Sequence, residues 1–234
     1  MKNILLTLSF FVSLSVGHTQ ESVNLENLVK RDGVFYFGDA EKPYTGIAFE
    51  LYDGGLKKSE TPFKNGVKNG LATLWYENGN KEGEVPMKNG KIDGLVTQWY
   101  ENGRMKDRRT FENGIVNGLA TTWHENGNKE SESFFKNDIM DGLATSWYEN
   151  GNKEMETTYK NDIMDGKFIQ WHERTGKKKL EANLKNGKMD GLFTSWHENG
   201  NKESEVNYKD DEMHGPYTEW YSTLWVSFDD GVKS

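Results

Sequence analysis

The sequence predicts an all-β protein, built as an elongated single-layer antiparallel β-meander of about eight tandem hairpin repeats. A motif of the form Gly-Leu-x-Thr-x-Trp recurs along most of the chain, every 24 residues with one interval of 25. Within each copy the side chains alternate with a period of two, which is the period of a strand. Turn sequences such as Asn-Gly separate the alternating stretches. Self-similarity at a fixed period of this length indicates a repeat architecture.

Two positions define the repeat. The glycine that opens it falls at Gly46, Gly70, Gly94, Gly118, Gly142, Gly166, Gly191 and Gly215. The tryptophan five residues later falls at Trp75, Trp99, Trp123, Trp147, Trp171, Trp196 and Trp220, and Leu51 takes its place in the first copy. We therefore expect residues 44–221 to form one continuous array.

Composition limits the possible functions of the 234-residue chain. Hydrophobic residues make up 34% of it, but aromatic rings at fixed steps can bury substantial area from few positions. The net charge of −8 argues against nucleic acid or an anionic membrane surface as partner. Because the chain has no cysteine, disulfides, cysteine-ligated zinc and a lipoprotein-type anchor are excluded.

The segments outside the array have their own signatures. Residues 1–19 read as a signal peptide, with Lys2 before an apolar run and small residues at its end. The mature protein is accordingly expected to be exported, as a periplasmic, outer-surface or secreted protein. Residues 20–43 are expected to form an N-terminal capping hairpin around Asp32-Gly33, and residues 222–234 a C-terminal cap.

Each copy reads as strand, turn, strand, turn. In the copy that begins at Gly118, Leu119, Thr121 and Trp123 share one face, and the intervening residues share the other. Glu125-Asn126-Gly127 then reverses the chain, and a second strand follows over 129–136. Because proline removes a ladder donor, Pro62 and Pro86 predict a short or bulged ladder in the second strand. Residues 173–176 carry the extra residue of the irregular copy.

The recurring pattern Gly-Leu-x-Thr-x-Trp-[Tyr/His]-Glu-Asn-Gly-Asn-Lys-Glu, followed by Lys-Asn-Gly-x-x-Asp-Gly, resembles the MORN-repeat variant family of bacterial proteins. The resemblance covers about residues 44–221. It implies a repeat scaffold, and scaffolds do not fix function. Some relatives are labelled YwqK-family antitoxins, which implies binding and neutralising another protein.

Histidines and glutamates are the candidates for chemistry. His124, His172 and His197 follow tryptophan, where other copies have tyrosine, and neighbouring copies lie about 9–10 Å apart. Zinc holds nitrogen ligands at about 2.0–2.1 Å, so no metal is expected there. The repeated glutamates could form an inverting hydrolase pair at about 9.5 Å, but catalysis needs carboxylates in unlike environments. We expect a solvated stripe of glutamates and lysines, with a basic protein docking along it as the alternative.

The aromatic rows offer the remaining surfaces. The tryptophans are in phase with a leucine and a threonine, so they are expected to be the core; the alternative is an exposed platform for sugars. The candidate partner-binding face is then the row of tyrosines and histidines on the opposite face: Tyr76, Tyr100, His124, Tyr148, His172 and His197.

The sequence thus predicts a non-catalytic, exported scaffold that binds a protein partner, with an antitoxin-like or immunity-like role as its most concrete form and no cofactor. An envelope or carbohydrate-binding module is the alternative, and a hydrolase is less favoured. The sequence does not identify the partner or the oligomeric state.

Overall fold

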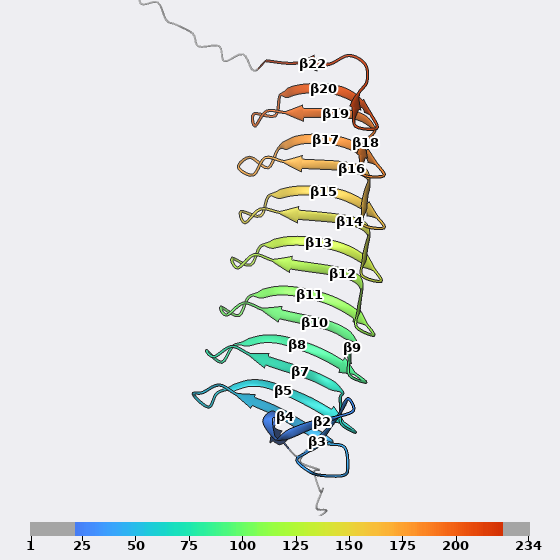
Figure 1. The fold of residues 1–234 in the computed structure, drawn as a ribbon. Helices are drawn as coiled ribbons and strands as arrows, with labels where there is room; N and C mark the ends of the chain where they lie inside the picture. The colour runs from blue at the N-terminus through green and yellow to red at the C-terminus, as the bar shows by residue number, and fades with distance from the viewer. Residues whose placement is uncertain (1–21, 222–234) are drawn as a thin grey trace, which may run out of the picture.

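A computed structural model describes residues 22–221, and it shows one long open sheet whose strands stack along a single axis (Figure 1). Strands that follow one another in sequence lie side by side and run antiparallel, so the predicted meander of 24-residue hairpins is confirmed. No α-helix occurs in this range; one 3₁₀ turn does. The described residues accordingly include no helix long and apolar enough to cross a membrane. The predicted signal peptide and C-terminal cap lie outside the described residues.

Seven complete hairpins form the array. Their first strands are β4 (Gly46–Leu51), β7 (Gly70–Trp75), β10 (Gly94–Trp99), β12 (Ile115–Trp123), β14 (Ile139–Trp147), β16 (Ile163–Trp171) and β19 (Gly191–Trp196). Their second strands are β5 (Lys57–Lys64), β8 (Lys81–Lys88), β11 (Met105–Glu112), β13 (Lys129–Lys136), β15 (Lys153–Lys160), β17 (Lys178–Lys185) and β20 (Lys202–Lys209). Short strands are β6 (Val67–Lys68), β9 (Lys91–Ile92), β18 (Lys188–Met189), β21 (Glu212–Met213) and β22 (Thr218–Glu219). Of the eighth repeat, only β21 and β22 are described.

The loop within each hairpin, here called the wide loop, has three residues. Tyr76 N–H donates to Asn80 O and Gly79 N–H to Tyr76 O, both at 2.9 Å. Gly79 has φ +87°, whereas Asn78 has no positive φ. This is a type I turn followed by a glycine bulge, so the positive φ predicted for Asn-Gly falls on the glycine alone. In the irregular copy, His172 N–H donates to Lys177 O at 2.8 Å, and the extra residue stays within the loop.

The connection between hairpins, here called the tight turn, is of another type. Asn89 has φ +51° and Gly90 φ +81°, the two left-handed residues of a type I′ turn. Aspartate replaces the glycine in three copies, at Asp138, Asp162 and Asp211, and still adopts φ between +62° and +72°. Aspartate and asparagine tolerate this conformation better than other side chains, which explains the composition of the tight turns.

The glycine that opens each repeat lies in a bulge, in contrast to the glycines of the wide loops and the tight turns. Gly94 has φ +124°, and a Cβ there would stand 2.9 Å from Pro86 Cγ. Asp93 N–H donates to Pro86 O at 3.0 Å. At Thr110, the residue equivalent to Pro86, the ladder of β11 with β12 shifts register. The bulge predicted near the prolines is therefore confirmed.

The sheet has two faces, named here for their repeated residues. The tryptophan face carries Leu71, Thr73 and Trp75, and the alanine face carries Ala72 and its partner Val85. Most buried apolar side chains of the hairpins lie on the alanine face: Ala48, Phe63, Ala72, Val96, Ala120, Ala144, Ala182 and Val206. The tryptophans from 75 to 196 are only half-buried. The prediction that they form the core is wrong, because no second layer of the described residues 22–221 covers their face.

The N-terminal residues add a small core at one end of the array (Figure 1). β1 (Ser22–Asn24) pairs in parallel with β4 and covers its free edge. After η1 (Leu25–Asn27), a hairpin of β2 (Leu28–Arg31) and β3 (Val34–Phe37) turns through Asp32-Gly33, where the sequence predicts one. Phe35 and Tyr44 pack on Phe63 with ring centroids 5.2 and 6.0 Å away, leaving Phe63 1% exposed.

Replacing Gly94 by alanine is expected to destabilise the array more than replacing Gly118. Both glycines have φ above +100°, but a Cβ at Gly118 meets no atom within 4 Å. Backbone strain of about 1–3 kcal/mol is then common to both variants, and the clash with Pro86 is added only at Gly94. Urea unfolding followed by circular dichroism measures the difference. Equal midpoints would show that Pro86 exerts no constraint.

Candidate partner-binding surface

The predicted row of tyrosines and histidines lies where the wide loops begin, and its polar ends bind the next repeat. Tyr76 Oη donates to Trp99 O at 2.7 Å, Tyr100 Oη to Trp123 O at 2.6 Å, and Tyr148 Oη to Trp171 O at 3.2 Å. Burial, reinforced by nearby glutamates, raises the pKa of each of these hydroxyls above 10.0. The hydroxyls therefore keep their protons at neutral pH and remain donors.

The histidines make the same contact. His124 Nε2 lies 2.8 Å from Trp147 O, His172 Nε2 2.8 Å from Trp196 O, and His197 Nε2 3.3 Å from Trp220 O. A carbonyl oxygen only accepts, so the proton must be on Nε2. Tyrosine and histidine are interchangeable here because both place a donor at the same carbonyl. We call this set the clamp row. Its role in partner binding stays a prediction, since its polar atoms are already engaged within the array.

The asparagines of the wide loop form a second set of contacts between repeats. Asn126 and Asn128 donate through Nδ2 to Glu149 O at 2.6 and 2.7 Å. Asn126 Oδ1 accepts the Asn128 backbone N–H at 2.9 Å, which fixes the loop itself. These hydrogen bonds explain why asparagine occurs at both of its positions in the Glu-Asn-Gly-Asn sequence.

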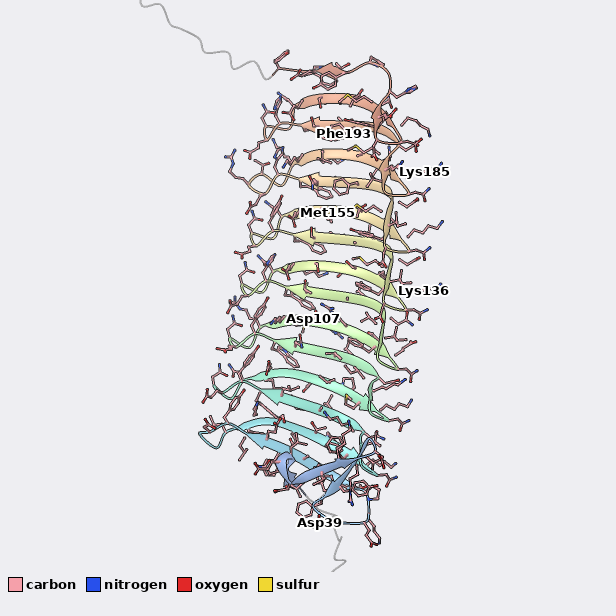
Figure 2. The ribbon with its side chains drawn as sticks, viewed as in Figure 1. Asp39, Asp107, Lys136, Met155, Lys185 and Phe193 are labelled. Carbon is pink, nitrogen blue, oxygen red and sulfur yellow. The ribbon has the colours of Figure 1, made fainter. Side chains whose placement is uncertain are left out.

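The tight turns join the repeats at the other edge of the sheet. Asp138 N–H donates to Val116 O at 2.9 Å, and Val116 N–H donates to Asp138 Oδ1 at 2.7 Å. Lysines end the second strands at this edge, among them Lys136 and Lys185 (Figure 2). Both edges are consequently occupied by contacts that hold successive repeats together.

The tryptophan face carries a ladder of lysines and glutamates. Lys129 Nζ lies 2.6 Å from Glu132 Oε2 and 5.4 Å from the centre of the Trp147 ring in the next hairpin. The same ion pair occurs as Lys57–Glu60, Lys81–Glu84, Lys129–Glu132, Lys153–Glu156, Lys178–Glu181 and Lys202–Glu205. A lysine covers the ring at Trp75, Trp147, Trp171, Trp196 and Trp220. These lysines occupy the space above the rings that a sugar platform would need.

Strand alternation alone would put residues three apart on opposite faces. A bulge after Trp123 makes Lys129 its partner, while Thr121 pairs with Glu132, so Lys129 and Glu132 share a face. The glutamates therefore have nearly identical environments, which suits a structural ladder and not an acid–base pair. No group of three or more possible metal ligands occurs among residues 22–221.

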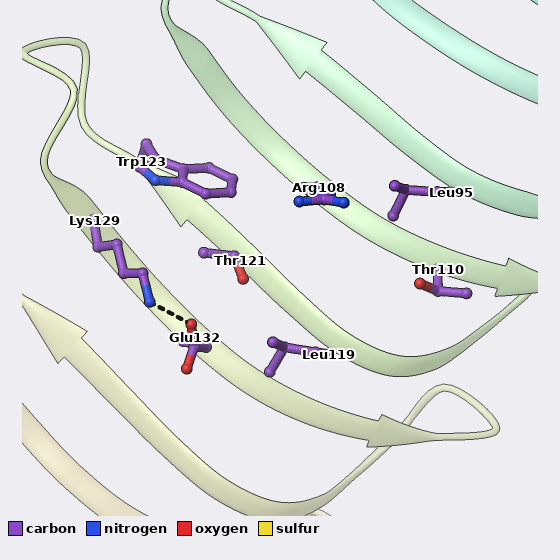
Figure 3. A pocket seen from close by; sticks show the side chains of 8 residues that line it. All are labelled: Leu95, Arg108, Thr110, Leu119, Thr121, Trp123, Lys129 and Glu132. Carbon is purple, nitrogen blue, oxygen red and sulfur yellow. Dashed lines mark hydrogen bonds and ion pairs between the residues drawn. The ribbon is translucent and has the colours of Figure 1, made fainter.

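The ladder is broken in β11, where Met105 and Arg108 stand in place of the lysine and the glutamate. The guanidinium of Arg108 has no ion pair or hydrogen bond with any described residue. Beside it lies a hollow of about 430 Å³ between Trp123 and the leucines Leu95 and Leu119 (Figure 3). The repeat pattern does not predict this hollow, although Arg108, which stands where other copies have glutamate, marks its position.

Apolar side chains run beside the ladder on the same face. We call Leu71, Pro86, Leu95, Leu119, Phe134 and Leu143 the leucine stripe. Its four leucines and Phe134 are between 39% and 53% exposed. The row turns mostly polar beyond Leu143, where it continues with Thr158, Lys167, Asn183, Leu192 and Asn207. Thr110 of β11 interrupts the stripe between Leu95 and Leu119. Exposed apolar residues that gather on one face mark interaction sites.

Comparison with protein families agrees with the repeat seen in the structure. Segments 68–89, 92–113, 116–137, 140–161 and 189–210 each match the family described as MORN repeat variant. The chain carries five MORN repeat variants. Each matched segment begins just before the glycine that opens a repeat and ends at the next tight turn, so a MORN unit contains one wide loop and one set of clamps. The resemblance to this family is confirmed, while the match says nothing of an antitoxin. A comparison with curated proteins finds no match.

Removal of one clamp hydroxyl should lower stability, and histidine should preserve it. Tyr100→Phe loses the 2.6 Å bond and leaves Trp123 O without this donor, at an expected cost of about 1 kcal/mol. Tyr100→His is expected to stay close to the parent, because His124 makes the same bond. Thermal midpoints compare the three proteins. Phenylalanine and histidine variants of equal stability would contradict the clamp.

One glutamate should make stability depend on pH. Hydrogen bonds from Lys167 and Lys178 lower the pKa of Glu181 below 4.5. A lowered pKa in the folded state stabilises at pH above the unfolded value, and the effect disappears as pH falls through the folded value. Glu181→Gln should therefore be less stable than the parent at neutral pH, and the difference should be smaller at an acidic pH below 4.5. Glu77→Gln, in a wide loop without an ion pair, is the control for urea unfolding at both pH values.

Proposed function

We propose that the protein is an exported, non-catalytic scaffold that binds a protein partner along the leucine stripe. The observation that carries this proposal is the row of exposed leucines on the tryptophan face. The polar atoms of the clamp row, by contrast, already bind other repeats of the array. From Leu71 to Leu143 the stripe crosses six strand spacings of about 4.8 Å, roughly 29 Å in all. A flat apolar surface of that length suits a protein chain better than a small molecule, which is usually bound in a concave pocket.

The rigidity of the array supports this role. Hydrogen bonds between repeats at both edges hold the leucines at a fixed pitch, so little conformational entropy is lost when a partner binds. Neutralisation of the partner, as in an antitoxin-like or immunity-like protein, is the most concrete form of the proposal. Export rests on the apolar N-terminal segment, and cell fractionation tests it directly.

Three lysines placed in the stripe are expected to abolish partner binding. Lysine is accepted at the equivalent position of the sixth repeat, where Lys167 pairs with Glu181 at 2.7 Å. The variant Leu95→Lys, Leu119→Lys, Leu143→Lys should therefore fold but lose the partner that the parent protein captures by cross-linking from an envelope fraction.

The matched control adds the same charge elsewhere. Glu77→Gln, Glu125→Gln, Glu149→Gln changes the net charge by +3 at the wide loops and should capture the partner as the parent does. Equal capture by the stripe variant would place the binding surface elsewhere and contradict the proposal.

A further inference from the structure

We propose that the hollow at Arg108 binds the side-chain carboxylate of an acidic residue that the protein partner presents beside an apolar residue. This inference rests on the proposed function and gives the leucine stripe a point of charge recognition in its middle.

The charge pattern of the tryptophan face singles out Arg108. Its pairing partners on the neighbouring strands, Thr97 and Thr121, are neutral. The next positions of the same row are Glu84 and Glu132, and each of these already pairs with a lysine of its own strand. Arg108 is therefore a cation in a row whose glutamates are already paired with lysines. Its guanidinium donors bind no described residue and can bind a ligand. A guanidinium binds a carboxylate through two parallel hydrogen bonds, which favours this anion.

The hollow is shaped by what β11 lacks. Lys57, Lys129, Lys153, Lys178 and Lys202 each extend over the tryptophan of the following hairpin. In β11 the residue at that position is Met105, so no lysine of the preceding hairpin covers the Trp123 ring, and the ammonium group of Lys129, which also lines the hollow, is paired with Glu132. The hollow of about 430 Å³ lies over this gap, with Lys129 and Glu132 paired at its rim (Figure 3).

The residues that line the hollow determine which kind of side chain can bind beside the carboxylate. Leu95 and Leu119 flank the hollow, and the only neutral hydrogen-bonding side chains in its lining, apart from the Trp123 ring, are Thr110 and Thr121. Apolar walls with so few hydroxyl partners suit an aliphatic side chain better than the many hydroxyls of a sugar. Because Leu95 and Leu119 also belong to the leucine stripe, a peptide lying along the stripe brings its acidic residue to Arg108. The net charge of −8 opposes a polyanion, whereas one carboxylate matches one guanidinium.

The decisive variant restores the regular ladder. Met105→Lys with Arg108→Glu recreates the lysine–glutamate pair of the other hairpins, so it should fold with an unchanged thermal midpoint and yet fill and recharge the hollow. Arg108→Gln removes the cation alone. Lys160→Gln, at the tight-turn edge, changes the net charge by −1, as the ladder-restoring variant and Arg108→Gln do, and serves as the charge control.

The probes are two capped peptides, acetyl-Leu-Glu-Leu-amide and acetyl-Leu-Gln-Leu-amide, with methyl glucuronide as a third. Binding is followed through the ¹⁵N-labelled indole N–H of Trp123, assigned with Trp123→Phe. The glutamate peptide should shift this signal in the parent and in Lys160→Gln, and bind at least tenfold more tightly than the glutamine peptide. Arg108→Gln should lose that preference, and the ladder-restoring variant should show no shift.

Equal binding of the two peptides, a shift that survives in the ladder-restoring variant, or a shift with the glucuronide alone would each overturn the inference. The ladder-restoring variant also separates this inference from the proposed function in the envelope capture. If the three-lysine stripe variant loses the partner while the ladder-restoring variant binds it as tightly as the parent, the scaffold function holds and the Arg108 site is wrong. If the peptide preference is present but the stripe variant still captures the partner, the scaffold surface is wrong instead.

Discussion

Each hairpin of this protein is held by a side chain that binds the backbone of the next hairpin. The hydroxyl or imidazole of the clamp row donates to the carbonyl oxygen of a tryptophan one repeat further on, as Tyr100 does to Trp123. A single-layer sheet has no second layer to pack against, so apolar burial alone does not fix the distance between its hairpins. Backbone ladders between neighbouring hairpins set their spacing. The clamps, the loop asparagines and the tight-turn contacts add hydrogen bonds between repeats at both edges, and the MORN motif consists largely of the residues that make them.

Much of the fold could be predicted from the sequence, because a repeated period of two and repeated turn residues are local signals. The hairpins, the bulge near the prolines and the capping hairpin at Asp32-Gly33 follow from such signals. The burial of the faces could not be predicted in the same way. Tryptophan usually marks a core, but here the small side chains of the alanine face are the buried ones. They are buried because larger side chains, such as those of Phe63 and Val85, share that face with them.

The candidate surface was predicted less well than the fold. The clamp row is predicted as a partner surface because it lies on the face opposite the tryptophans, and the sequence does not reveal that a carbonyl oxygen of another repeat is within reach. The ion pair between Lys129 and Glu132 depends on a bulge of one residue. This bulge places Lys129 on the same face of the sheet as Glu132, although the two residues are three positions apart. Arg108 could have been found from the sequence, since it is the exception in the glutamate row, but its meaning depends on the absence of a partner in three dimensions.

The wide loop that begins after Trp171 contains one residue more than the loops of the other repeats, yet the strands on either side keep their pairing, from Gly166 with Leu184 to Trp171 with Lys178. The extra residue is absorbed beyond the end of the ladder, where Gly176 N–H closes the loop on His172 O. Length variation can therefore accumulate at this edge through duplication and drift, repeat by repeat, while the faces of the sheet keep a constant spacing. An array of this kind can acquire new loops one at a time without having to refold the remainder.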